Sequence, residues 1–303
     1  MSQLRDEGAE RRAFVGPADV PENSVVRFSI PGLDQPGIIG DQLELMAHAV
    51  NTLSGFLGRR DLPTLDRAGL ATLDLKRADV LILFGGSIIA GADLLAQAIR
   101  RGLAKRYLIV GGRGHTTGLL RRAVAQHVPS LVAGRTEADL FAQYLLFVHG
   151  LEVDLLERRS TNCGSNVANC LDLLRSFAIP HGSIVAIQDA AMQRRIDAGF
   201  ARHLPSEHRL INYAAYSTTV VAGKGRLEFA DPPVGMWAMS QFVSLLLGEI
   251  PRLTDNSTGY GPIGRGFIAH VEIPERVSDA YRYLSGRFPT LVRQTHDRWA
   301  TAT

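Results

Sequence analysis

The chain has 303 residues, 46% of them hydrophobic, so it can bury one large core or two moderate ones. Its formal charge is only +3 and its Lys and Arg residues are dispersed, which gives no support to nucleic-acid binding. No run approaches the roughly 20 apolar residues that cross a bilayer, so we expect no membrane span.

The two cysteines, Cys163 and Cys170, indicate a reducing compartment rather than a disulfide scaffold. Neither has a second Cys pair or a His cluster beside it in the sequence, so no metal site is expected. Residues 1–23 are polar and lack the apolar middle of a signal peptide. Together these features predict a cytoplasmic protein.

The amino-terminal part predicts an arm followed by helices. Residues 1–36 are rich in charge, Pro and Gly and are expected to form a flexible arm. Residues 37–57 carry apolar side chains at helical spacing, which predicts one amphipathic helix. Residues 61–74 are mixed in character and have room for a short second helix. We therefore expect residues 37–75 to form the first part of a helical lobe.

The central part, residues 76–216, alternates between short apolar runs and helical patterns. The expected strands are Val80–Phe84, Tyr107–Val110, Val153–Leu156, Ile184–Ile187 and Leu210–Tyr213. The expected helices are Ala92–Arg101, Thr117–His127, Thr136–His149, Asn166–Phe177 and Ala191–His203. This alternation predicts an α/β fold with a parallel sheet of about five strands flanked by helices, which carries its ligand at the carboxyl edge of the strands.

The alternation stops after residue 216. A stretch containing Gly and Pro reaches Gly235, a buried helix is expected over 236–247, and a last helix over 275–287. Residues 251–265 hold many loop formers. We therefore expect residues 217–303 to complete the smaller, mostly helical lobe begun by residues 37–75.

Two glycine-bearing turns follow the first two expected strands. The first is Gly85-Gly86-Ser87 and the second is Gly111-Gly112-Arg113-Gly114. Glycines let a ligand come close to the main chain, and a following helix directs its amides and positive dipole end at an anion. The alternative is that the glycines only allow each strand to turn into its helix.

The second turn is not a dinucleotide fingerprint, because Gly112, Gly114 and Gly118 are spaced one residue too widely and follow the second strand. His115 and Thr116 could donate to phosphate or ribose oxygens, although His115 could equally be a capping or surface residue. We therefore expect a small nucleotide-like ligand, but not NAD.

Polar residues at the later strand ends extend the candidate site. Thr136 suits a helix N-cap with Asp139 completing a capping box, which leaves Glu137 for a ribose diol, an ammonium group or proton transfer, or as a helix-dipole carboxylate. The connection at 157–166 holds Thr161, Asn162 and Asn166, which could close a pocket or form a turn and a cap.

The segment 188–195 follows the fourth strand and offers Asp189, Gln193 and Arg194. An arginine in this position can clamp a carboxylate or phosphate. The structural alternative is an N-cap aspartate with surface arginines. No known hydrolase, P-loop or metalloprotease motif occurs, so the sequence assigns no catalytic residue.

These motifs together resemble the bacterial SanA/ElyC/YdcF family. The resemblance runs from about residue 37 to the tail, through the segments Gly85-Gly86, Gly111–His115, Arg135–Ala138, Ser160–Asn166, Asp189–Arg195, Gly248–Arg252, Gly259–Pro262 and His270–Glu272. It implies a Rossmann-like domain with a small helical domain, and binding of S-adenosyl-L-methionine without a settled reaction. The chain departs from the family at Ala191, where many members have His, so no catalytic role resting on that His is carried over.

Three functions therefore remain open. The first is an S-adenosyl-L-methionine-binding enzyme of undetermined reaction, with a transferase as the favoured class. Its expected partner is a small-molecule ligand. The second is a hydrolase or transferase acting on phosphate or pyrophosphate compounds linked to envelope biogenesis. The third is a non-catalytic ligand-binding regulator. No feature of the sequence specifies an oligomeric state.

Overall fold

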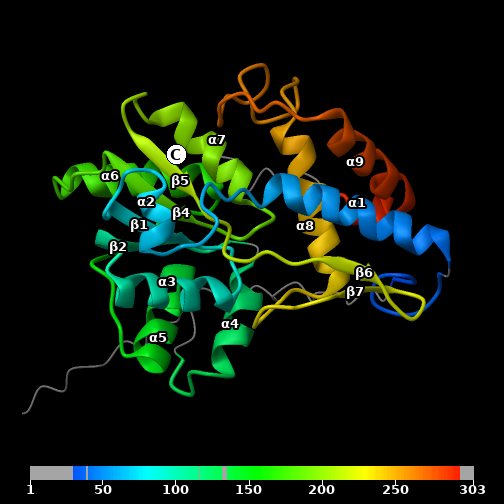
Figure 1. Ribbon diagram of the computed structural model, residues 1–303, viewed down its shortest axis with the longest axis horizontal. Coiled ribbons are helices and arrows are strands. Elements are labelled where there is room, and N and C mark those ends of the chain that lie inside the picture. Colours follow the sequence, from blue (N-terminus) through cyan, green and yellow to red (C-terminus); the bar gives the residue numbers. More distant parts are fainter. Residues whose placement is uncertain (1–29, 39, 115, 132–134, 294–303) are drawn as a thin grey trace, which may run out of the picture.

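The computed structural model describes residues 30–38, 40–114, 116–131 and 135–293. A five-stranded, all-parallel sheet lies at its centre, with the strand order β3-β2-β1-β4-β5 (Figure 1). The strands are β1 (Ala78–Phe84), β2 (Ala104–Val110), β3 (Leu155–Glu157), β4 (Ser183–Ile187) and β5 (Arg209–Asn212). The predicted Rossmann-like parallel sheet is confirmed. β2 begins three residues earlier than predicted because exposed Lys105 and Arg106 interrupt its apolar pattern.

Helices cover both faces of this sheet (Figure 1). One face carries α3 (Ile89–Arg101), α4 (Thr117–Ala125) and α5 (Glu137–His149), and the other carries α6 (Cys163–Ser176) and α7 (Gln193–His203). The central strand β1 serves both layers, because Leu81 and Leu83 pack on the first face while Ile82 and Phe84 pack on the second. This two-sided burial explains why β1 reads as a continuous apolar run.

The predicted start of α5 is confirmed in detail. The Thr136 hydroxyl accepts a hydrogen bond from the Asp139 amide, and the Asp139 carboxylate accepts one from the Thr136 amide, which forms a reciprocal capping box. The helix ends at Gly150, whose φ of 64° is left-handed and therefore favours glycine. These local signals fix the first turn of α5, and with it Glu137, at the carboxyl edge of the sheet.

Most of the remaining elements form a helical lobe beside the sheet (Figure 1). The lobe consists of α1 (Asp41–Leu57), β6 (Val220–Ala222), β7 (Leu227–Phe229), α8 (Met239–Leu253), α9 (Glu275–Arg287) and the 3-10 turn η1 (Pro289–Leu291). The short helix α2 (Arg67–Ala71), expected in this lobe, lies instead against the sheet domain, where Arg101 donates to the Leu65 carbonyl and Arg209 to the Leu73 carbonyl. The β6–β7 hairpin was not predicted from the sequence. The helix α8 runs six residues beyond its predicted end, because Pro251 lies in its last turn and does not break it.

Part of the expected amino-terminal arm is folded. Leu33 is buried, and the Gly32 carbonyl accepts a hydrogen bond from the Leu227 amide at 2.8 Å. The amides of Gly37 and Ile38 both donate to the Gly225 carbonyl. Residues 30–38 therefore form a turn and a short connecting segment that support the hairpin, and α1 begins at Asp41 rather than at residue 37. The rest of the expected arm, residues 1–29, lies outside the described residues.

The helical lobe shares its apolar core with one face of the sheet. A single cluster of buried side chains runs from Leu81 in β1 through α3 and α5 to Leu53 in α1 and Leu246 in α8. The lobe is therefore packed onto the sheet rather than joined to it by a linker.

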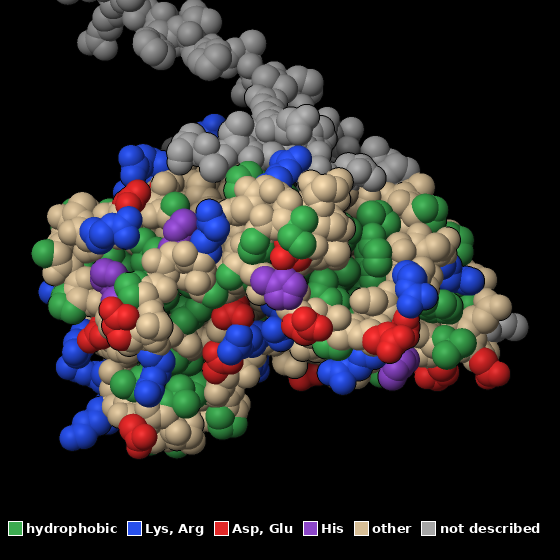
Figure 2. All heavy atoms as spheres, turned by 90° about the horizontal axis from the view of Figure 1, so that it is seen from above, with side chains coloured by type: hydrophobic (Ala, Val, Ile, Leu, Met, Phe, Trp, Pro, Cys, Tyr) green, Lys and Arg blue, Asp and Glu red, His purple; other side chains and the backbone are tan. Residues whose placement is uncertain are grey.

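The surface carries charges of both signs. On the face drawn in Figure 2, basic and acidic side chains of the described residues are interspersed, and neither forms a continuous field. None of the helices in the described ranges is both long and apolar enough to cross a bilayer.

Asn51 joins α1 to the hairpin, which gives a direct test of this architecture. Its amide group donates to the Val220 carbonyl and accepts from the Val220 amide, both at 2.8 Å, as a neighbouring strand would. We expect Asn51→Ala to lower the free energy of unfolding by about 2 kcal/mol, because two backbone groups lose their partner. Urea denaturation measures this. Thr52→Ala, which removes a hydroxyl bonded only within α1, should cost less than about 0.5 kcal/mol. Equal losses in both variants would contradict this role.

Candidate functional site

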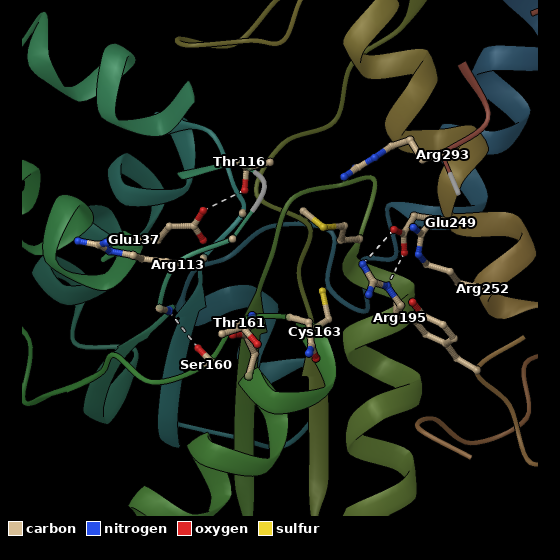
Figure 3. A pocket seen from close by; sticks show the side chains of 18 residues that line it. Arg113, Thr116, Glu137, Ser160, Thr161, Cys163, Arg195, Glu249, Arg252 and Arg293 are labelled. Carbon is tan, nitrogen blue, oxygen red and sulfur yellow. Dashed lines mark hydrogen bonds and ion pairs between the residues drawn. The ribbon is translucent and has the colours of Figure 1, made fainter. Parts of the chain in front are cut away.

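A cleft of about 730 Å³ opens at the carboxyl ends of β1 and β2, where the sheet edge faces the helical lobe (Figure 3). We call it the basic cleft. The sheet side of its wall consists of Gly85, Gly86, Gly112, Arg113, Gly114, Thr116, Glu137, Ser160, Thr161, Asn162, Cys163, Asn166, Met192 and Arg195. The lobe side consists of Glu249, Arg252, Tyr260 and Arg293.

Two glycines on neighbouring strands make the seat of Glu137. A Cβ on Gly85 would lie 2.4 Å from the Oε2 atom of Glu137, and a Cβ on Gly111 would lie 3.0 Å from the Cα of Gly85. The strand ends can approach each other, and the carboxyl group can rest on them, only because both residues lack a side chain. Part of the glycine pattern is thus explained by this buried acid.

Glu137 is a buried carboxyl group at the inner end of the cleft. It accepts hydrogen bonds from the hydroxyls of Thr116 and Thr117, each at 2.9 Å (Figure 3). Burial raises its pKa, and these hydrogen bonds, together with one from the Gly86 amide, partly oppose the rise. Burial favours the protonated, neutral form of Glu137, and a carboxyl group with a raised pKa is suited to proton transfer.

The first amides of α5 are already used by the protein. The Glu137 amide donates to the Gly112 carbonyl and the Ala138 amide to the Gly111 carbonyl, both at 2.8 Å. Gly112 itself is packed against the chain, because a Cβ there would lie 1.9 Å from the Ser160 carbonyl oxygen. The close approach that Gly112 permits is therefore one between two segments of backbone, and α5 has no amides left for an anion.

Within the described ranges, the amino terminus of α6, unlike that of α5, has backbone amides that are free to bind an anion. Asn162 caps the helix by accepting from the Ser165 amide at 2.9 Å. Among the described residues, the next two amides, those of Cys163 and Gly164, have no hydrogen-bond acceptor. The Cys163 thiol projects toward the cavity in Figure 3, and burial raises its pKa. The positive end of the α6 dipole therefore faces the cleft.

Three arginines lie across the cleft from Glu137, where α7 meets the helical lobe. Arg195 of α7 forms a two-point ion pair with Glu249 of α8, at 2.6 and 2.9 Å, and both side chains are nearly inaccessible. Arg252 donates to the Gly248 carbonyl, and Arg293 points into the cleft (Figure 3). Burial and the adjacent Arg252 lower the pKa of Arg293.

The four arginines that line the cleft outnumber its two carboxylates, and one of those is Glu137 with its raised pKa. The cleft is therefore electrostatically suited to an anion. No group of three or more His, Cys, Asp or Glu side chains within the described ranges is arranged to hold a metal ion.

The structure brings nine of the candidate residues together in the cleft. They are Gly85, Gly86, Gly112, Gly114, Thr116, Glu137, Thr161, Asn162 and Asn166. Five others do not line it, namely Ser87, Gly111, Asp189, Gln193 and Arg194. His115 lies outside the described residues.

Asp189 is buried between the sheet and the lobe. Its carboxylate accepts hydrogen bonds from the Ala191 amide at 2.9 Å, the Tyr216 hydroxyl at 2.9 Å and the Trp237 indole at 3.0 Å. All three donors belong to the protein itself. Asp189 therefore acts as a structural link between the end of β4 and the lobe.

Gln193 and Arg194 are likewise engaged in the fold. The Gln193 side chain accepts from the Gln188 amide at 2.9 Å. Arg194 donates to the Phe56 carbonyl at 2.6 Å, and its guanidinium lies 4.3 Å from the centre of the Phe56 ring. The Ser87 hydroxyl is buried and has no hydrogen-bond partner among the described residues.

The sequence analysis did not identify Arg195, Arg252 and Arg293, which we call the arginine wall of the cleft. Arg195 directly follows Arg194, and only the phase of α7, which turns Ile196 and Phe200 toward the sheet, decides which arginine reaches the cleft. Glu249 lies just beyond the predicted end of α8 at residue 247, and Arg252 lies in the segment 251–265 that was read as rich in loop formers. Tyr260 stands in a segment that carried the family resemblance without an assigned role. No family model matches this chain.

The buried link at Asp189 predicts a pH dependence of stability. Burial raises the pKa of Asp189 to about 6, against hydrogen bonds that lower it. The folded protein therefore keeps this proton at pH values where the unfolded chain, with a pKa of about 4, has released it. Its contribution to the free energy of unfolding falls as the pH rises from about 4 to above 6, by on the order of 3 kcal/mol.

Asp189→Asn removes this titration. We expect the difference in unfolding free energy, wild type minus variant, to decrease between pH 4.5 and pH 7.5. Urea denaturation at the two pH values measures it, and the variant at each pH is the control for all other groups. Parallel pH profiles of the two proteins would show that Asp189 titrates normally.

Proposed function

We propose that the basic cleft binds the phosphate or pyrophosphate group of a small molecule, and that the protein is a hydrolase or transferase acting on such compounds. The observation that carries this proposal is the convergence of Arg195, Arg252 and Arg293 on one side of the cleft, across from Glu137 and beside the amino terminus of α6 (Figure 3). Guanidinium groups and helix amides are the donors that phosphate oxygens prefer.

The arginines of the cleft have different partners, and this arrangement suits a ligand with more than one anionic oxygen. Glu249 neutralises part of the Arg195 charge and holds its guanidinium in place. Arg252 donates to a backbone carbonyl, and Arg293 forms no ion pair within the described ranges. Two positive charges therefore remain without a carboxylate partner on the lobe side, which suits a doubly charged phosphate.

Glu137 is the group we propose for proton transfer. It lies across the cleft from the arginines, and its raised pKa suits it to give a proton to a leaving oxygen or to take one from an attacking hydroxyl. If ligands bind but no turnover occurs, the protein is a binding module instead. A cytoplasmic location is part of this proposal, and the buried free thiols of Cys163 and Cys170 suit it.

S-adenosyl-L-methionine is the second candidate ligand, as membership in the SanA/ElyC/YdcF family would imply. One feature favours it: the Tyr260 ring at the wall offers the π face that a sulfonium prefers. Two guanidinium groups, those of Arg195 and Arg265, already lie within 6.0 Å of the centre of that ring. The positive sulfonium would therefore meet like charges.

Replacing the unpaired arginines tests the phosphate proposal. We expect Arg252→Gln and Arg293→Gln each to weaken pyrophosphate binding about tenfold, because each removes a charged donor from the cleft. Isothermal titration calorimetry measures the affinity. Arg122→Gln, at an exposed position on α4, is the matched control and should bind like wild type. Undiminished binding in both cleft variants would show that Arg252 and Arg293 do not bind the pyrophosphate group.

A second variant separates position from charge. A Cβ on Gly248 would lie 2.9 Å from the Nη1 atom of Arg252 and 3.2 Å from the Cβ of Arg293. Gly248→Ala keeps every charge and improves helix propensity, yet it forces both arginines to move. We expect weaker pyrophosphate binding without loss of thermal stability.

The two ligand classes predict different orders of affinity. In a cleft with excess positive charge, pyrophosphate should bind more tightly than S-adenosylhomocysteine, and S-adenosylhomocysteine more tightly than S-adenosyl-L-methionine, because only the last carries the sulfonium charge. Calorimetric titration of all three decides the order. Tightest binding of S-adenosyl-L-methionine would establish the second candidate. A phosphatase assay with and without Mg²⁺ then tests for turnover.

A further inference from the structure

A second cavity, of about 1130 Å³, adjoins the basic cleft. It lies between α6, α7 and the segment that joins α8 to α9. We call it the apolar groove, because its inner wall consists of Ala168, Gly199, Tyr260, Phe267 and Ile268. No Asp or Glu among the described residues lines it.

The groove and the cleft share a wall. Asn162, Cys163, Arg195 and Tyr260 line both cavities. A ligand whose anionic group lies among the cleft arginines therefore has a path along the start of α6 into the groove. The remaining basic side chains of the groove are Arg202, His203 and Arg265. Arg202 and His203 are exposed, whereas Arg265 is half-buried with its guanidinium 5.8 Å from the centre of the Tyr260 ring.

The wall of the groove formed by Tyr260, Phe267 and Ile268 is preformed. The amides of Phe267 and Ile268 both donate to the Tyr260 carbonyl, at 2.8 and 3.1 Å, and the Ala269 amide donates to the Ala198 carbonyl of α7. The rings of Tyr260 and Phe267 contact each other edge to face, with their centres 5.4 Å apart. An apolar group can therefore enter the groove without first ordering a loop.

From this juxtaposition we propose that the substrate is an amphiphilic phosphate ester, whose phosphate lies in the basic cleft and whose aliphatic group lies in the apolar groove. The proposal rests on the proposed function and narrows its substrate class. Inside the groove, the side-chain hydroxyl of Ser165 and the amide of Asn162 are engaged in capping α6. The side chains of Ala168, Phe267 and Ile268 have no hydrogen-bond donor for a polar substituent. Polar esters such as sugar phosphates thus gain little there.

A homologous series of ligands tests this. Calorimetry with methyl, butyl, hexyl and octyl phosphate should give an affinity that rises about two- to fourfold per added methylene until the groove is filled, as expected for transfer of apolar surface out of water. Glucose 6-phosphate and AMP should bind no more tightly than methyl phosphate. A flat alkyl series, or AMP binding more tightly than hexyl phosphate, would overturn the proposal.

Ala168→Phe fills the groove and leaves the cleft intact, since Ala168 does not line the basic cleft. We expect hexyl phosphate to lose its advantage and to bind like methyl phosphate, while pyrophosphate affinity stays within twofold of wild type. Ala201→Phe, the same change at an exposed position of α7, should preserve the full alkyl series. Equal losses from the two variants would contradict the groove assignment.

The two proposals fail in different ways. If pyrophosphate and methyl phosphate do not bind to the wild-type protein, the phosphate function itself is wrong. If both bind but longer alkyl chains bring no gain, only the substrate class is wrong.

Discussion

The ion pair between Arg195 and Glu249 is the interaction on which the site depends. It joins α7 of the sheet domain to α8 of the lobe through two charge-assisted hydrogen bonds, and both partners are almost fully removed from water. Removing one partner of such a buried pair typically costs about 3–5 kcal/mol, because the other charge is left uncompensated. The pair thereby fixes the distance between the two walls of the basic cleft. It also holds Arg195 where the cleft and the apolar groove meet.

The two walls contribute different chemistry. The sheet side supplies the buried acid Glu137, threonine and serine hydroxyls and the amides of α6. The lobe side supplies the groups that hold the arginines in place: Glu249 pairs with Arg195, the Gly248 carbonyl accepts from Arg252, and Arg293 packs against Gly248. The anion site that we propose needs both walls. The core that the lobe shares with the sheet keeps the lobe arginines in a fixed position relative to Glu137.

Much of the fold follows from the sequence because its signals are local. The five apolar runs gave five strands, and the Thr136–Asp139 spacing gave the start of α5. The sheet half of the cleft followed as well, because parallel strands end at one edge. The lobe half did not, since the positions of Arg252, Tyr260 and Arg293 depend on packing between distant segments. The hairpin was also missed, because each of its strands has only three residues.

The glycines show how one pattern can have two causes. Their spacing suggested close approach of a ligand, yet Gly85 and Gly111 make room for Glu137, and Gly112 makes room for the Ser160 carbonyl. Only the placement of neighbouring atoms distinguishes these cases.

The contact between Gly85 and Glu137 has a consequence for how this protein can change. A methyl group at position 85 would lie 2.4 Å from the carboxylate oxygen, 3.1 Å from the Cα of Gly111 and 3.2 Å from the Cβ of Glu137, so shortening the acid at 137 relieves the closest of these contacts. The two sites should therefore behave epistatically, with the double replacement less harmful than the sum of the single ones. The residue at the end of β1 and the acid of the site are therefore expected to change together rather than independently.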